Sequence, residues 1–114
     1  MGNPGQGPGQ RERRTIVPVD AVSIAPDQYK VLVENDRVRV LEARYRAGVK
    51  SRMHSHPDMV AVALTPAKVK FTLANRQTAE VELRAGETMF APGQDHTAEN
   101  TGTSEFRVIL VELK

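Results

Sequence analysis

The sequence predicts an all-β domain, built as an antiparallel sandwich or barrel, and three observations support this. From Tyr29 onward the chain consists of short runs rich in Val, Leu, Ile and Thr, separated by turn residues. The runs recur about every ten residues, a spacing typical of such folds. No segment shows the 3.6-residue hydrophobic period of an amphipathic helix. We therefore expect eight or more strands around one modest core.

The strands are expected in a regular order along the chain. Segments 29–34 (YKVLVE) and 37–47 (RVRVLEARYRA) should form a hairpin across Asn35-Asp36. The later strands and turns are predicted at 59–65, 68–74, a turn at 75–76, 78–84, 87–91, a turn at 92–95, 96–100 and 106–114. Val69, Phe71 and Leu73 alternate with polar residues and should point inward. The last run, FRVILVEL, is apolar at nearly every position, so we expect a partner subunit or the N-terminal segment to cover its second face.

Residues 1–14 are predicted to be a disordered tail, and residues 15–114 a single domain. The first nine residues, MGNPGQGPG, hold four of the eight glycines and two of the seven prolines, a composition that cannot bury enough apolar surface to fold. The tail carries three of the 16 basic and one of the 14 acidic residues, which leaves 13 of each in the domain. Nucleic-acid binding needs a basic patch on folded structure, so we do not expect it.

The sequence lacks a membrane span, a secretory signal and cysteine, and this limits the classes of protein to which it can belong. No apolar run reaches the roughly 18 residues of a membrane span, and the N-terminus lacks the apolar core of a secretory signal. We therefore expect a cytoplasmic protein with no membrane partner. The chain has no cysteine, so any metal must be held by nitrogen or oxygen ligands.

Two of the three histidines stand one residue apart in MHSHPD. On an extended strand, His54 and His56 share a face with Cα atoms roughly 6.5 Å apart, so both imidazoles can converge on one ion. Continued alternation would place Val60, Val62 and Leu64 on that face too, which directs the pair into the barrel. Buried imidazoles need partners for their ring nitrogens, and two together favour a metal or a polar cluster.

The third histidine, His96, lies on a separate predicted strand that could bring it opposite the pair. Three imidazoles with open positions are a known pattern for a metal that binds a further ligand. The alternative interpretation is a chance surface pair, with His96 an ordinary loop histidine.

Two motifs around these histidines resemble those of the cupins. The first cupin motif runs G-x5-H-x-H-x3,4-E-x6-G, and Gly48, VKSRM, His54, Ser55 and His56 match its first part. The second runs G-x5-P-x-G-x2-H-x3-N, and here Gly86, ETMFA, Pro92, His96, TAE and Asn100 match. The resemblance implies a small single-domain cupin, an RmlC-like jelly roll or double-stranded β-helix, that forms a homodimer. It also implies His54, His56 and His96 as metal ligands, and Asn100 as a turn-stabilising residue.

The sequence departs from the family in two places. The ligand glutamate is replaced by Val60, or by Ala61 if the gap is one residue longer. The second motif is one residue short in PGQDH, which leaves open whether Gln94 or Asp95 moves toward the metal. Asp58 shares the alternation of His56 and is an alternative source of a carboxylate.

Losing the glutamate changes the expected chemistry. Three neutral imidazoles leave a divalent ion with its full charge, which favours an anionic or bidentate oxygen ligand. Some cupin dioxygenases have such a three-histidine iron centre, but the ligands alone do not choose between Fe, Zn, Cu, Ni and Mn.

Three more residues are candidates for contact with a small-molecule ligand. Arg52 could orient a carboxylate, Gln94 could hydrogen-bond a bound water or substrate, and Tyr45 could turn its hydroxyl toward the site. Their alternatives are a solvated arginine, a turn-stabilising glutamine and a core tyrosine. The leading functional hypothesis is a metal-dependent enzyme of the iron dioxygenase type. The alternatives are a non-catalytic small-molecule or metal-binding module and a metal-free structural cupin.

Overall fold

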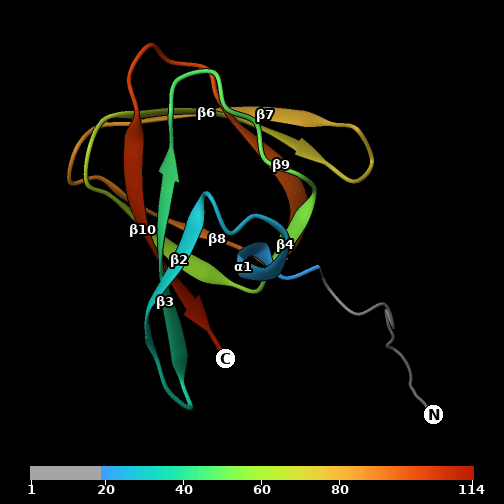
Figure 1. Ribbon diagram of the computed structural model, residues 1–114, viewed down its shortest axis with the longest axis vertical. Helices are drawn as coiled ribbons and strands as arrows, with labels where there is room; N and C mark the ends of the chain where they lie inside the picture. Colours follow the sequence, from blue (N-terminus) through green and yellow to red (C-terminus); the bar gives the residue numbers. More distant parts are fainter. Residues whose placement is uncertain (1–18) are drawn as a thin grey trace.

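A computed structural model describes residues 19–114 as two antiparallel sheets packed face to face (Figure 1). One sheet has the strand order β2-β3-β10-β5-β8 and the other the order β4-β9-β6-β7. The described elements are α1 (Ala21–Ile24), β2 (Tyr29–Glu34), β3 (Val38–Tyr45), β4 (His54–His56), β5 (Met59–Ala63), β6 (Ala67–Leu73), β7 (Thr78–Leu83), β8 (Thr88–Ala91), β9 (Gln94–Asn100) and β10 (Phe106–Leu113). This confirms the predicted all-β fold as a jelly roll. The predicted tail and residues 15–18 lie outside the described residues.

The two predicted hairpin turns are confirmed, and local side chains explain them. Asn35 accepts hydrogen bonds from the backbone N–H groups of Arg37 and Val38, which closes the turn between β2 and β3. Between β6 and β7, Arg76 has a φ of 72° and the Asn75 side chain accepts from the Gln77 N–H at 2.9 Å. Asparagine makes such contacts with its own turn readily, so each turn is fixed without a glycine.

The core lies between the sheets and is built from alternate residues of the strands. On β3, Leu41, Ala43 and Tyr45 are all buried, and the inward residues of β5 and β10 pack beside them. Val69, Phe71 and Leu73 on β6 line the same interior, as predicted. Many of the inward residues are alanines, which leaves room for a cavity near the histidines.

The predicted continuous strand after the histidines is wrong. The chain leaves the four-stranded sheet after His56, passes Pro57 and Asp58, and enters the five-stranded sheet as β5. The interruption resets the alternation, so Ala61 is buried, whereas Val60 is only half-buried. The inward residues of this strand are therefore Met59, Ala61 and Ala63 rather than the predicted valines.

One further expectation about strands is corrected, and another stays a prediction. Strand β10 lies between β3 and β5, and its burial alternates along the strand, so residues 19–114 pack against one of its faces. Cover of the other face by a partner subunit or by the N-terminal segment stays a prediction. Strand β9 begins at Gln94, two residues earlier than predicted, because Gln94 pairs with His56 across the sheet. The remaining turn is Pro92-Gly93, and the Gly93 N–H donates to the Asp58 carboxylate at 2.7 Å.

The short helix α1 was missed by the sequence reasoning. Asp20 caps it by accepting a hydrogen bond from the Ser23 N–H at 3.3 Å. Four residues are too few for a hydrophobic period to appear. In residues 19–114 no helix is long and apolar enough to cross a membrane.

Candidate metal centre

The three histidines converge in the interior of the protein. His54 and His96 are direct cross-strand partners on β4 and β9, and His56 lies two residues along β4 on the same face. All three are buried, with at most 4% of each residue exposed. One ring nitrogen from each lies within 4.8 Å of the others, so the group could hold a metal ion. The predicted convergence is therefore confirmed.

Hydrogen bonds fix which nitrogen of each ring on β4 is available. The His54 Nδ1 lies 2.7 Å from the Arg52 carbonyl oxygen, which can only accept, so Nδ1 carries the proton. The His56 Nδ1 likewise lies 2.7 Å from a carboxylate oxygen of Glu112. In both rings Nε2 is left to bind an ion, an arrangement common among metal-ligating histidines.

His96 differs because neither of its ring nitrogens has a hydrogen-bond partner, although both are buried. Phe71 stacks on the ring with centroids 4.7 Å apart, which holds its plane but satisfies no polar atom. Leaving a buried polar atom unpaired costs about 1–3 kcal/mol. An ion bound to one nitrogen of His96 would remove part of that cost. The three histidines are therefore suited to hold a metal ion.

Burial keeps the imidazoles in the form that binds metals. Burial, together with the smaller effect of the neighbouring histidines, lowers the pKa of His54 to about 4 and that of His96 to about 3. Both rings are therefore neutral near pH 7, as ligation requires.

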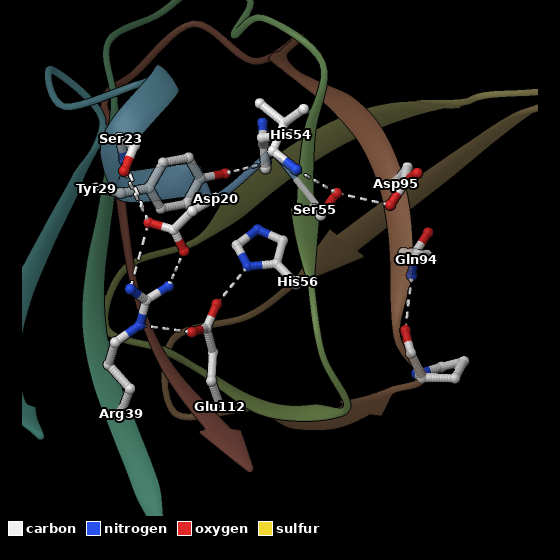
Figure 2. A network of polar contacts seen from close by, with 12 residues as sticks. Asp20, Ser23, Tyr29, Arg39, His54, Ser55, His56, Gln94, Asp95 and Glu112 are labelled. Atoms are coloured by element: carbon white, nitrogen blue, oxygen red, sulfur yellow. Dashed lines mark hydrogen bonds and ion pairs between the residues drawn. The ribbon is translucent and has the colours of Figure 1, made fainter. Parts of the chain in front are cut away.

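Glu112 belongs to a network that the sequence reasoning missed (Figure 2). Its second carboxylate oxygen accepts from the Arg39 Nε at 2.8 Å, and the same guanidinium pairs with Asp20. Burial would raise the pKa of Glu112, but hydrogen bonds from His56 and Arg39 outweigh it and hold that pKa below its ordinary value. The sequence did contain a signal for Glu112: it is a single charged residue that shares the inward alternation of Val108 and Leu110.

Two tyrosines complete the polar surroundings of the histidines. The Tyr29 hydroxyl lies 3.0 Å from the His54 Nε2 and 2.6 Å from the Tyr45 hydroxyl. Both side chains are buried, and burial raises the pKa of each phenol above its ordinary value. Tyr29 is the one buried residue of β2, and it precedes both histidine motifs, so motif comparison could not find it.

A cavity of about 250 Å³ extends from His56 and His96 between the sheets. Its lining includes Tyr29, His56, Phe71, Gln94 and His96, and the rest is mainly aliphatic. None of the described residues that line it is an aspartate, glutamate, lysine or arginine. The cavity therefore suits a small ligand with an apolar body.

The other predicted site residues are placed as follows. Tyr45 and Gln94 line the cavity, and the Gln94 amide also contacts the Pro92 carbonyl at 3.4 Å. Arg52 is exposed, and its contact with the site is through its backbone carbonyl. Asn100 donates to the backbone oxygens of Tyr45 and Ser104, the turn-stabilising role expected of it.

Among the described residues, no aspartate or glutamate joins the three histidines in the place of the missing ligand glutamate. Asp58 is exposed and accepts from Gly93, whereas Asp95 accepts from the Ser55 hydroxyl at 2.7 Å. The two candidate glutamate positions differ, since Ala61 lines the cavity and Val60 does not.

Known structures show the same architecture. A cupin domain from Bordetella pertussis Tohama I matches with a TM-score of 0.69 and 27% identity, over 75% of this chain and 91% of that one. An uncharacterised conserved protein with a double-stranded β-helix domain from Klebsiella pneumoniae matches with a TM-score of 0.60 and 21% identity, over 90% and 81% of the two chains. An RmlC-like cupin family protein from Methanocaldococcus jannaschii matches with a TM-score of 0.60 and 12% identity, over 91% and 86%. No protein-family model and no curated protein matches the sequence.

The fold and the site together define a double-stranded β-helix protein with a buried three-histidine cluster. The chain has the small, single-domain cupin fold of the RmlC-like kind.

Proposed function

We propose that the protein binds one divalent transition-metal ion through His54, His56 and His96 and presents it to a small oxygen-chelating ligand in the cavity. The unpaired, buried nitrogens of His96 carry this proposal. An isolated imidazole with no polar partner is costly to bury, and an ion is the partner that the other two rings leave room for.

The charges near the cluster support the choice of ligand. With neutral imidazoles, Asp20 and Glu112 contribute −2 and Arg39 contributes +1, so the network carries one negative charge. A divalent ion would make the centre positive by one unit. A small anionic ligand with two oxygen donors would offset that charge and fill open positions.

For the activity, we favour a dioxygenase-type reaction with an iron ion. Iron would supply the one-electron chemistry with O2 that none of the side chains possesses. The aliphatic wall and Phe71 would exclude water from the ligand. One observation favours a second candidate, a non-catalytic binding module: the described lining of the cavity offers no carboxylic acid or lysine for acid–base catalysis.

Metal content tests the first part of the proposal. Protein purified without added metal, or loaded with iron, zinc or copper, should hold close to one ion per chain by elemental analysis. The double variant His54→Ala/His56→Ala should lose this ion, because it removes two of three ligands. Arg52→Ala is the control and should keep full loading, since only its carbonyl contacts His54. A wild-type protein that refuses all three metals would refute the metal site.

Oxygen consumption separates the two candidate functions. The iron-loaded protein would be mixed with diketones, thiols and hydroxyacids in turn, and both oxygen uptake and binding heat recorded. Uptake with one class and none with the double histidine variant would support the dioxygenase. Tight, metal-dependent binding with no oxygen uptake across the panel would instead support the binding module.

A further inference from the structure

The hydroxyl of Tyr29 occupies a position beside the nitrogen that a metal needs. The His54 Nδ1 is committed to the Arg52 carbonyl, so Nε2 is the atom left to bind an ion. The Tyr29 oxygen lies 3.0 Å from that Nε2. Figure 2 shows the phenol ring projecting from β2 toward His54. An ion on His54 would therefore meet the Tyr29 oxygen.

The separation of these two atoms is that of two ligands on one ion. Nitrogen and oxygen ligands each lie about 2.0–2.2 Å from such a metal, so neighbouring ligand atoms are about 2.8–3.1 Å apart at the 90° angles of an octahedral site and about 3.3–3.6 Å apart in a tetrahedral one. The distance between Nε2 and the phenol oxygen is 3.0 Å and falls within the octahedral range. An ion bound by His54 would also break the present hydrogen bond by taking the nitrogen lone pair. The buried phenol would then need a new partner, and the bound ion could be that partner.

Without an ion, burial and the neighbouring Tyr45 and Glu112 raise the pKa of Tyr29 and keep the phenol neutral, so a bound cation is what would make its oxygen anionic. The Tyr45 hydroxyl lies 2.6 Å away and can donate a hydrogen bond to it. Tyr45 is itself held in the core, stacked on Phe106 with centroids 5.1 Å apart. One phenolate would cancel the single positive charge that remains when a divalent ion joins the network of Asp20, Arg39 and Glu112.

We infer that the Tyr29 phenol oxygen is the fourth protein ligand of the metal, in the place of the glutamate that this chain lacks. The inference rests on the proposed metal site. As the bond between metal and oxygen forms, the phenol proton leaves to the buffer, and no electron is transferred. Together with the network of Asp20, Arg39 and Glu112, the divalent ion, the three histidines and Tyr29 then carry no net charge. A substrate must bind at a remaining position or displace the phenolate.

Phenolate bound to ferric iron has a visible charge-transfer absorption band that histidine and water ligands do not produce, so Tyr29→Phe gives a direct test. The protein would be loaded anaerobically with ferrous iron and then oxidised with one equivalent of ferricyanide. The wild type should show the band, and Tyr29→Phe should lose it. Tyr45→Phe is the matched control: it removes only a hydrogen bond to the ligand, so the band should shift but persist. Because the phenol is a direct ligand, Tyr29→Phe should also weaken zinc binding by at least the ten- to hundredfold typical of outer-shell partners.

The outcomes separate this inference from the metal site itself. Full iron loading without the band in the wild type would refute the tyrosine ligand and leave the three-histidine site standing. A band that survives in Tyr29→Phe and disappears in Tyr45→Phe would show that Tyr45 is the ligand, and this result would also refute the inference. Failure of the wild type to bind any metal would refute both proposals. Folding of each variant would be checked by circular dichroism, and removal of one hydroxyl should leave the spectrum unchanged.

Discussion

Lowering the pH from about 8 to about 5 should decrease the free energy of unfolding of the metal-free protein by about 4 kcal/mol. In the folded protein the pKa of His54 is about 4 and that of His96 about 3, whereas an unfolded histidine has a pKa of about 6.5. Below about pH 6.5 the unfolded chain therefore binds protons that the folded protein does not. The stability is fully present above that pH and is lost as the pH falls toward the folded values. Urea unfolding at several pH values would measure this change.

A control variant assigns the pH effect to the histidines. His96→Phe keeps an aromatic ring against Phe71 and should roughly halve the loss between these pH values. Despite burial, hydrogen bonds from His56 and Arg39 hold the folded pKa of Glu112 below its ordinary value, so its contribution is lost mainly at lower pH. A slope that is the same in wild type and His96→Phe would show that other groups cause the pH dependence.

Glu112→Ala should destabilise the protein by about 3–5 kcal/mol, because it breaks a buried ion pair and removes a hydrogen-bond acceptor from both of its partners. Arg39 would retain only Asp20, and the proton on the His56 Nδ1 would lose its acceptor. Glu112→Gln keeps the shape of the side chain and should cost less, about 1–3 kcal/mol. Chemical denaturation at pH 7 would give these free energies.

An exposed ion pair provides the matched control for Glu112. Glu34 pairs with Lys114 at 2.8 Å, and both side chains are exposed. Glu34→Ala should change the free energy of unfolding by less than about 1 kcal/mol, since exposed pairs contribute little. If Glu112→Ala proved as mild as Glu34→Ala, the buried network would not stabilise the fold as we propose.

Much of the fold could be predicted from the sequence because strands and turns have local signals. Alternation identified the inward face of β6, and the asparagine turns identified two hairpins. The convergence of His54, His56 and His96 was also predictable, because two motifs with fixed spacing carry them. These features depend on neighbours within a few residues.

The parts that were missed depend on contacts between distant segments. Nothing near Pro57 shows that the chain changes sheet there, and that change reverses the alternation of the next strand. Tyr29 and Glu112 reach the histidines from outside the motifs, on strands whose pairing is known only in three dimensions. Asp58 was the candidate carboxylate close after His56, whereas the carboxylate that contacts His56 is that of Glu112 on β10.

The network around His56 also bears on how the chain acquires its metal. Arg39 and Glu112 are 73 residues apart in sequence, and His56 and Glu112 are 56 apart. Such contacts form only after long loops have closed, which is slow compared with local hairpin formation. A partly folded chain can present His54 and His56 as a pair on one short strand, but it has neither His96 opposite them nor Glu112 behind them. Metal uptake would therefore be a late event in folding. The folded barrel would bind the ion more tightly than compact intermediates that contain the same hairpins.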